Sequence, residues 1–267
     1  MKVSDLKIPV EAKDYQECSE FVRKQIEEII SDSIKNGTNK ILIQTNLKRG
    51  LPLENINKVA GPFVEAWALE QFEYISENLK NKYKLIHVEP GVRLAPYDIL
   101  LQFKKQRNGN DGIVTANVDV KATSNDIPTS GLSPNITSFG RIRTEYINDP
   151  DYIFIILSLK HKVYGEKDPK TLMTNGTMEV MSFAVYDLKF VSERDISYNP
   201  ALGTGQLQIR DIHYVTETKR TTWEFCQMLD KKFISSKGDQ AWNKLAELHG
   251  WLKGTETLPE VKAEEVV

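Results

Sequence analysis

Two short segments, about twenty residues apart, carry acidic and basic side chains of the kind that hydrolyse phosphodiester bonds. Asp98 precedes an apolar run, and Asp119 and Lys121 are separated by one valine. Because side chains alternate along a strand, Asp119 and Lys121 are expected to project from the same face. The turn between the two segments is short enough for Asp98 to lie beside Asp119. We therefore expect the three side chains to converge at one end of a sheet.

These residue types suit magnesium-dependent hydrolysis. Mg²⁺ prefers oxygen ligands in near-octahedral geometry, which two carboxylates, a phosphate oxygen and water supply together. The ion offsets charge in the transition state and lowers the pKa of its bound water. Asp98 and Asp119 are the predicted metal ligands. Lys121 would orient the attacking water, stabilise the developing hydroxide, or accept its proton if the lysine pKa is depressed, and these alternatives stay open.

Glu65 is a candidate third metal ligand and catalytic acid. In an expected helix it shares a stripe with Leu69, Phe72 and Leu79, which places it on an otherwise apolar side. A carboxylate is costly there unless it is paired or binds a cation. The alternative is a glutamate at the helix edge that pairs with an arginine such as Arg93.

The rest of the sequence predicts a mixed α/β fold with a central mixed β-sheet flanked by helices. Apolar spacing, capping signals and turn residues predict these elements. The expected helices span about 14–36, 57–81, 134–148, 221–233 and 239–252, and the expected strands 40–44, 83–88, 97–103, 113–122, 152–159, 178–190 and 206–214. Cys18 and Cys226 show no metal-binding spacing, so both are interpreted as buried thiols in helices.

Composition is that of an ordinary globular protein, with 40% hydrophobic and 27% charged residues. No apolar run approaches the roughly 20 residues of a membrane span, and residues 1–14 mix charges with short apolar groups, so we expect a cytoplasmic protein. The net charge of −2 is unusual for a nucleic-acid enzyme. Four glutamates and one lysine in an acidic tail, residues 255–267, contribute −3 of it and leave +1 on residues 1–254. A near-neutral protein still binds DNA if its basic residues line one cleft.

The segment around Asp98, with Asp119 and Lys121, resembles the PD-(D/E)xK signature of type II restriction endonucleases, of the blunt-cutting EcoRV and HincII kind. Tyr97 interrupts the literal Pro-Asp pair, but that proline is not a ligand. Three further segments resemble the active-site helix, the catalytic strand with its recognition loop, and the C-terminal strand, loop and helix of this group: 61–65, 119–123 with 133–138, and 205–209 with 219–224.

This resemblance implies a restriction-endonuclease-like domain over residues 1–254, and a function. It would be a homodimer that cuts duplex DNA at a specific palindromic site with Mg²⁺, in a restriction-modification system with a partner methyltransferase. The N-terminal helical part, to about residue 60, would dimerise. Residues of about 61–190 would form the catalytic core, and about 191–254 would contact DNA.

The resemblance also gives a use to polar residues outside the catalytic strand. Beside that strand they become candidates to contact bases or phosphates, although by composition they form a surface loop, a solvated strand and a helix cap. Leu132 would wedge between base steps. The candidates are Thr123, Asn125, Ser130, Leu132, Ser133, Asn135, Gln206, Gln208, Lys219 and Arg220.

The sequence also allows two other functions. The first is another nuclease on the same core, such as a repair nickase or junction resolvase. The second is a non-catalytic DNA-binding or interaction protein. Nucleotide hydrolysis, dinucleotide binding and serine hydrolysis lack their minimal motifs in this sequence.

Overall fold

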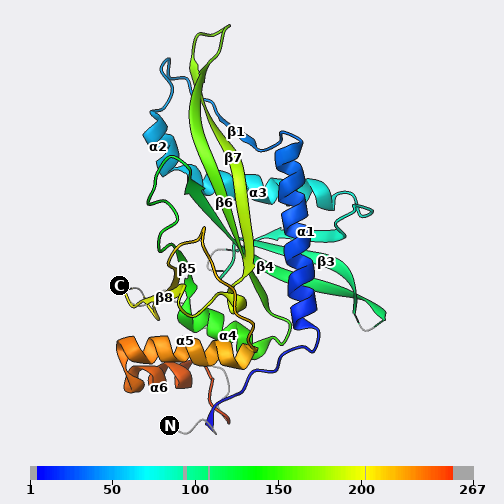
Figure 1. The fold of residues 1–267 in the computed structure, drawn as a ribbon, viewed down its shortest axis with the longest axis vertical. Helices are drawn as coiled ribbons and strands as arrows, with labels where there is room; N and C mark the ends of the chain where they lie inside the picture. The colour runs from blue at the N-terminus through cyan, green and yellow to red at the C-terminus, as the bar shows by residue number, and fades with distance from the viewer. Residues whose placement is uncertain (1–4, 93–94, 108, 202, 255–267) are drawn as a thin grey trace.

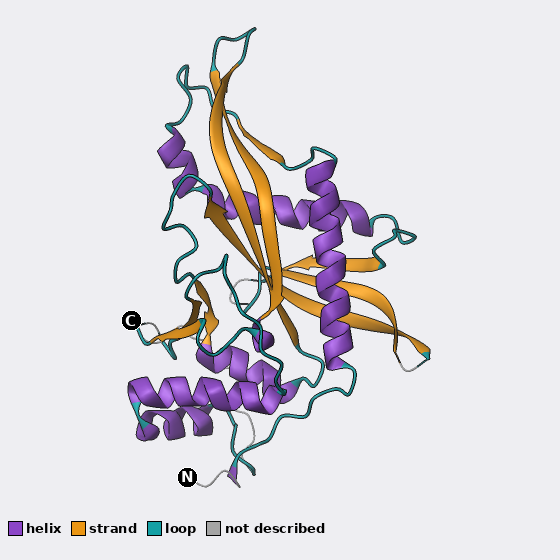
Figure 2. Ribbon diagram, in the orientation of Figure 1, coloured by secondary structure: helices purple, strands orange, loops and turns teal. Residues whose placement is uncertain are grey.

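The computed structural model describes residues 5–92, 95–107, 109–201 and 203–254. A six-stranded mixed sheet, in the order β1-β7-β6-β4-β3-β2, and a three-stranded sheet, β5-β9-β8, are flanked by helices (Figure 2). The predicted mixed α/β fold is therefore confirmed. The helices are α1 (Tyr15–Lys35), α2 (Leu53–Lys58), α3 (Ala60–Ser76), α4 (Phe139–Asn148), α5 (Thr222–Lys237) and α6 (Asp239–Leu248), and the strands are β1 (Lys40–Ile43), β2 (Leu85–Pro90), β3 (Ile99–Arg107), β4 (Asn110–Ser124), β5 (Asn135–Ser138), β6 (Ile153–Lys167), β7 (Thr174–Asp187), β8 (Ile196–Asn199) and β9 (Gln206–Ile209).

The large sheet is antiparallel except for β4 and β6, which pair in parallel. Strands β6 and β7 form a long hairpin that projects at one end of the molecule, with β1 and α2 beside it (Figure 1). Helices α5 and α6 lie at the opposite end, near α4 and the small sheet (Figure 1). Strand β4, which carries Asp119 and Lys121, thus lies in the middle of the large sheet.

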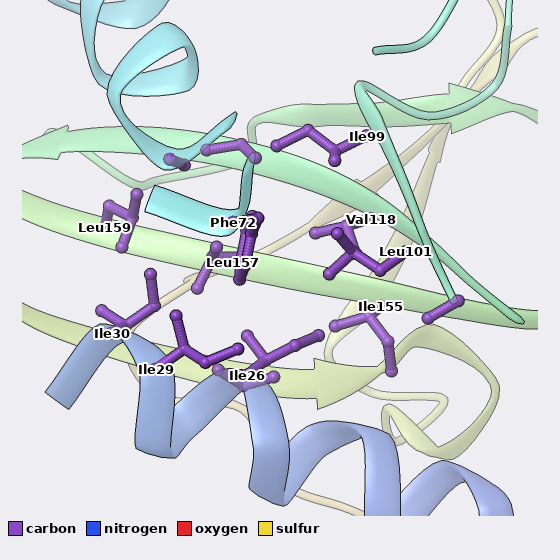
Figure 3. Close-up of a cluster of buried hydrophobic side chains, with 14 of the residues drawn as sticks. Ile26, Ile29, Ile30, Phe72, Ile99, Leu101, Val118, Ile155, Leu157 and Leu159 are labelled. Carbon is purple, nitrogen blue, oxygen red and sulfur yellow. The ribbon is translucent and has the colours of Figure 1, made fainter. Parts of the chain in front are cut away.

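One hydrophobic cluster covers the face of the large sheet on which α1 and α3 pack. Ile26, Ile29 and Ile30 of α1 and Phe72 of α3 meet strand residues such as Val118 and Leu157 there (Figure 3). A second cluster lies between the sheet, α4, α5, α6 and the small sheet, and includes Phe154, Tyr186 and Trp251. The middle of β4, residues 116–120, is buried, so packing fixes the position of the part of the strand that carries Asp119.

The predicted helix over 57–81 is wrong in its continuity, because the chain forms α2 and α3 with a break at Val59. Pro62 explains the break. A proline lacks the N–H that would bond to the carbonyl of Lys58, and its ring would clash with that carbonyl in a continuous helix. The helix also ends earlier, at Ser76, where the Asn78 side chain accepts a hydrogen bond from the Lys80 N–H and stabilises a turn.

The predicted helix over 134–148 begins only at Phe139, because residues Asn135–Ser138 form β5 instead. Ile136 and Thr137 are β-branched, and their segment gains backbone pairing with β9 that a helix would forgo. The strand expected over 206–214 stops at Ile209, where the Asp211 side chain accepts from the His213 N–H and turns the chain. Strand β8 was not predicted.

The remaining predicted elements are confirmed with shifted ends. Helix α1 ends before Asn36 and Gly37, and Gly37 has a φ of +74°. The capping box of Thr221 and Glu224 opens α5 as expected. Cys18 and Cys226 are buried in α1 and α5. Among the described residues, no helix is both long and apolar enough to cross a membrane.

Candidate active site

Two hydrogen bonds to β4 bring Asp98, the residue before β3, beside Asp119. The Asp98 N–H donates to the Val118 carbonyl at 2.9 Å, and its carboxylate Oδ2 accepts from the Val120 N–H at 2.7 Å. The second bond fixes the carboxylate beside the peptide that separates Asp119 from Lys121. The structure thus brings together the three residues that the sequence pattern singled out.

Asp119 and Lys121 project from the same face of β4 and form an ion pair, with 2.7 Å between Lys121 Nζ and Asp119 Oδ1. Asp119 is only 3% exposed, and its other oxygen, Oδ2, has no hydrogen-bond partner among the described residues. Burial raises the Asp119 pKa to about 7, and the nearby charges of Asp98 and Glu65 act in the same direction against the opposing Lys121. Half of this buried carboxylate is therefore left without a stabilising contact.

Glu65, on α3, joins the same electrostatic cluster. Burial raises its pKa first, and the charge of Asp98 and a hydrogen bond with Asp98 raise it further, while Lys121 opposes them. Phe72 is buried on the same helix, but Leu79 lies beyond the end of α3 and is exposed, so that part of the predicted stripe was wrong. The alternative partner, Arg93, lies outside the described residues.

The donor set fits a hard divalent cation. Oxygen ligands are what Mg²⁺ prefers, and the unpartnered Oδ2 of Asp119 is a buried acceptor that a cation would satisfy. Within the described part of the chain, however, no group of three or more His, Cys, Asp or Glu side chains is already arranged around one ion position. Asp98 and Asp119 would hold the ion together with non-protein oxygens, and Glu65 would join only after moving.

The small sheet holds two of the predicted DNA-contacting amides side by side. Asn135 of β5 is opposite Gln208 of β9, and Gln208 Nε2 donates to Asn135 Oδ1 at 2.9 Å. Gln206 lies two residues earlier on β9, opposite Ser138 and half-buried. Gln206 and Gln208 project from one face of β9, since Leu207 between them is buried.

The loop between β4 and β5 contains the other candidates. Leu132 is 52% exposed, and Ser133 is exposed with a φ of +50°. Asn125 is exposed, and Ser130 Oγ accepts a hydrogen bond from the Ser124 N–H at 2.7 Å. Thr123, in contrast, is buried with its hydroxyl 3.4 Å from the Leu159 carbonyl, so contact with DNA would require this hydroxyl to leave the protein interior.

Lys219 and Arg220 are placed apart from this loop. Lys219 is exposed, and its Nζ lies 3.9 Å from Oε1 of Glu20 on α1. Arg220 donates to the Val191 carbonyl at 2.9 Å, which is a structural contact. At the N-terminus of α5, which Lys219 and Arg220 precede, the Glu11 carboxylate accepts from the Thr222 N–H and hydroxyl, both at 2.7 Å. This end of the helix is stabilised by the protein's own anion.

With this geometry established, comparison with known proteins identifies the family. The family model for the type II restriction endonuclease HpaI matches residues 2–250. The chain belongs to this HpaI family. The chain is also 56% identical over 225 residues to the type II restriction enzyme HpaI of Haemophilus parainfluenzae, a match that covers 84% of this chain and 87% of that protein. A solved structure, the NlaIV restriction endonuclease, matches with a TM-score of 0.44 and 14% identity over 84% of this chain and 86% of its own.

Membership of the HpaI family confirms the predicted enzyme class. This HpaI-family chain is a type II restriction endonuclease, a site-specific deoxyribonuclease, and its substrate is DNA. The alternatives of a repair nickase, a junction resolvase or a non-catalytic binding protein are set aside. Two polar residues were not predicted: Tyr186, whose hydroxyl feels the charge of Asp119, and Glu11, which contacts Thr222 at the N-terminus of α5. Tyr186 lies in an apolar strand pattern and Glu11 precedes the first helix, so neither carries a local motif that would have revealed it.

Proposed function

We propose that the chain is a Mg²⁺-dependent homodimeric restriction endonuclease of the PD-(D/E)xK type that hydrolyses one phosphodiester bond in each strand of a palindromic site. The observation that carries this proposal is the Asp119 carboxylate, which is buried, paired with Lys121 through one oxygen and unpartnered at the other. A buried acceptor of this kind is costly unless a ligand satisfies it. The proposal assigns a cation, held with Asp98, to that position.

The side chains of the cluster have separate tasks. When bound, Mg²⁺ offsets charge on the transition state and lowers the pKa of its bound water. Asp98 is fixed by its hydrogen bond to the Val120 N–H, so its other oxygen keeps a defined direction. Asp119 must lose its proton to serve as a ligand, because its pKa is raised to about 7. Lys121 holds its ammonium group beside Asp119, in a place to orient the attacking water or stabilise the hydroxide.

DNA recognition is assigned to the surface formed by the loop of residues 124–134 and the β5–β9 pair, here called the recognition surface. Amide side chains such as Asn135 and Gln208 make paired hydrogen bonds to base edges in the major groove. Leu132 presents a large apolar side chain to solvent, which suits contact with a base step. The residues that contact bases would then lie close to Asp119 and Lys121, because the loop follows β4 directly in the chain.

A second copy of the chain is proposed because cleavage of both strands needs two catalytic clusters, and the proposal finds one in each chain. A twofold dimer matches the symmetry of a palindrome. Six exposed apolar side chains belong to β1, α2, the start of α3 and the loops next to them, including the turn of the β6–β7 hairpin, and β1 and α2 lie beside that hairpin (Figure 1). We assign Leu42, Leu47, Leu53, Val59, Phe63 and Leu172 to a dimer surface, because exposed apolar side chains that come together in one patch mark interaction sites.

The finer organisation follows from these assignments. Residues before about 60 would contribute to the dimer surface, residues of about 61–190 would form the catalytic core, and residues of about 191–254 would complete the recognition surface. A methyltransferase that modifies the same site would protect the DNA of the host cell, and both enzymes would work where that DNA lies, in the cytoplasm. The proposed acidic tail, residues 255–267, lies outside the described part of the chain.

The catalytic proposal is tested with Lys121→Ala and with Lys104→Ala, an exposed lysine on the neighbouring strand β3, as the matched control. Unmethylated plasmid DNA is incubated with Mg²⁺, and the ends of the fragments are sequenced. Lys121→Ala should lose about 10²–10⁴-fold in cleavage rate and still bind the same site in Ca²⁺. Lys104→Ala should cut at discrete sites as the wild type does. Cleavage by Lys121→Ala at the wild-type rate would remove the cluster from catalysis.

The dimer surface is tested with the double substitution Leu42→Glu and Leu172→Glu, which places charges on two exposed apolar positions. Sedimentation velocity should show a dimer for the wild type and a monomer for the variant. The variant should also cut plasmid DNA at least about tenfold more slowly, because a 1.4 kcal/mol loss of association already gives that factor. A variant that remains a dimer would place the interface elsewhere on the chain. Leu79→Glu, at an exposed apolar position beyond α3, is the control.

A further inference from the structure

Tyr186, near the end of β7, connects the catalytic strand with the recognition surface. The tyrosine is 4% exposed, and its hydroxyl donates to the Ile212 carbonyl at 3.0 Å. Ile212 belongs to the segment that follows β9, outside the large sheet. One hydrogen bond thus connects a buried hydroxyl of the large sheet to the backbone that follows β9 of the small sheet.

Sheet register places Tyr186 in the same row as Asp119. Asp119 is opposite Ile156 across the β4–β6 pair, and Ile156 is opposite Tyr186 across the β6–β7 pair. Residues opposite each other on neighbouring strands project from the same face, so Tyr186 shares the face of Asp119, two strands away. Their electrostatic contact agrees with this placement, since the Asp119 charge, after burial, raises the pKa of the Tyr186 hydroxyl.

The segment held by Tyr186 in turn holds the loop. The Ile212 N–H donates to the Gly131 carbonyl at 3.0 Å, and the Ser133 N–H donates to the Arg210 carbonyl at 3.0 Å. Gly131 has a φ of +95°, and a Cβ at this position would lie 2.8 Å from His213 Nε2 and 3.0 Å from Ile212 Cγ2. Residues 131–133 are therefore packed closely against residues 210–213, at the side of the loop that presents Leu132.

A second anchor holds the other side of the loop. The Ser124 N–H donates to Ser130 Oγ at 2.7 Å, and Ser124 is the last residue of β4, three residues beyond Lys121. The Asn125 N–H donates to the His161 carbonyl at 2.7 Å. The loop is thus tied to the catalytic strand directly at one end, and through Ile212 and Tyr186 to the row of Asp119 at the other.

We propose that Tyr186 is a positioning residue that fixes the loop of residues 130–133 relative to Asp119, so that cleavage depends on correct seating of this loop on the recognised bases. This inference rests on the proposed function, in which the loop contacts DNA. A loop with two anchors on the sheet transmits a displacement of its tip to the catalytic row. Without the Tyr186 hydrogen bond, the loop moves and the positions of Asp98, Asp119 and Lys121 stay the same. The cleavage rate then depends less on whether the bases match the recognised site.

The test compares Tyr186→Phe with Tyr152→Phe. Both tyrosines are buried in the second hydrophobic cluster, but the Tyr152 hydroxyl has no hydrogen-bond partner among the described residues, so its removal is the matched control. Single-turnover cleavage with Mg²⁺ is measured on a duplex with the recognised site and on duplexes with one base pair changed. Binding of the same duplexes is measured in Ca²⁺, and folding is checked by thermal unfolding.

Tyr186→Phe should cut the recognised site about 10- to 100-fold more slowly, because a small misplacement of catalytic groups has an effect of that size. The ratio of the cleavage rate at the recognised site to the rate at an altered site should fall. The affinity for DNA in Ca²⁺ should change much less than the cleavage rate. Tyr152→Phe should match the wild type in all three measurements. A merely structural role would lower the thermal midpoint and slow every site equally, and that result, or a wild-type ratio in folded Tyr186→Phe, would overturn the proposal.

Two further variants keep the outcome decisive. If Tyr186→Phe fails to fold, Gly131→Ala displaces the same loop from residues 210–213 without removing a side chain, and it should narrow the ratio in the same way. Asn135→Ala tests the proposed recognition surface separately. Unchanged selectivity in Asn135→Ala would count against that surface, whereas altered selectivity there with wild-type behaviour of Tyr186→Phe would overturn the positioning role alone.

Discussion

Two buried acid–base pairs in this protein differ in how completely the base satisfies the acid. Asp230 on α5 accepts from Arg143 Nε and Nη2 at 2.6 and 2.8 Å, and Trp242 Nε1 donates to it at 3.0 Å. The Arg143 guanidinium also lies 4.2 Å from the centre of the Trp251 ring. Asp119 accepts one bond from Lys121 and keeps an unpartnered oxygen. The Asp230 carboxylate is complete without a ligand, although Arg143 Nη1 has no hydrogen-bond partner among the described residues, whereas the Asp119 carboxylate is incomplete.

Under the proposed function, this difference separates a structural pair, Arg143 with Asp230, from a catalytic pair, Lys121 with Asp119. A planar guanidinium offers two parallel donors to a carboxylate, whereas an ammonium group offers a single point contact. Arg143 on α4 therefore locks α4 to α5 and α6. Lys121 contacts only one oxygen of Asp119, and the pKa of this carboxyl stays raised. A cation bound to the other oxygen would stabilise the charged form. If the proposed function is correct, incomplete satisfaction of the buried carboxylate, more than its burial alone, distinguishes Asp119 from Asp230.

The largest expected effect concerns the complete pair. Arg143→Met removes the partner of a buried carboxylate and should lower the free energy of unfolding by about 3–5 kcal/mol. Urea unfolding followed by tryptophan fluorescence measures this change. The double variant Arg143→Met with Asp230→Leu should recover much of the loss, because no buried charge then lacks a partner. If the single variant is as stable as the wild type, the comparison between the two pairs fails.

The incomplete pair should respond to cations. At a concentration one hundred times its Kd, a divalent cation that binds only the folded state should raise the free energy of unfolding by about 2.7 kcal/mol. Calcium is suitable, since its ligands are also oxygens. Asp119→Ala should lose this stabilisation, and Asp111→Ala, at an exposed position on the same strand, should keep it. An equal gain in Asp119→Ala would show that the ion binds elsewhere.

The protonation of Asp119 gives a smaller effect with a defined sign in metal-free protein. Its folded-state pKa of about 7 lies above the usual value of 3.8, so the folded state binds more protons than the unfolded state between these pH values. The stability of the wild type should therefore fall as pH rises from about 4 to 7. Asp119→Asn lacks this dependence and should gain about 2 kcal/mol over the wild type between pH 5 and pH 8 in EDTA. Parallel pH profiles of the two proteins would contradict the raised pKa.

The comparison between the pairs also shows what sequence predicts well. Asp98, Asp119 and Lys121 could be brought together from sequence because strand alternation and a short hairpin connection are local rules. The structure bears out their juxtaposition in the β3–β4 pair. Arg143 and Asp230 are 87 residues apart, and no local pattern connects them.

Tertiary pairing explains the errors in the predicted fold. Residues Asn135–Ser138 follow helical apolar spacing with the segment after them, yet they pair with β9, which is about seventy residues later. Strand β8 is short and its pairing with β9 is equally invisible in the local pattern. Pro62, in contrast, is a local signal for the break between α2 and α3, and backbone chemistry alone would have placed it.

The smallest expected effect concerns Glu65, which is the candidate third metal ligand beside Asp98 and Asp119. Glu65 faces Asp98 and Lys121 from α3, and burial raises its pKa. If it moves to contact the cation, Glu65→Gln should weaken Mg²⁺ about tenfold, the lower end of the loss found for groups that support metal ligands. The measurement is the Mg²⁺ concentration that gives half the maximal single-turnover rate, with Glu73→Gln, exposed on the same helix, as control.

The direction of the Glu65→Gln result assigns this residue. Loss of a ligand lowers Mg²⁺ affinity and leaves the rate at saturating Mg²⁺ nearly unchanged, because the ion then still reaches its position. A glutamate that only raises the proton affinity of its neighbours would act in the opposite way: its removal lowers the Asp119 pKa and strengthens Mg²⁺ binding below pH 7. Equal Mg²⁺ dependence in Glu65→Gln and the wild type would confine the metal ligands to the two aspartates. Glu65 would then be a glutamate at the helix edge with no contact to the ion.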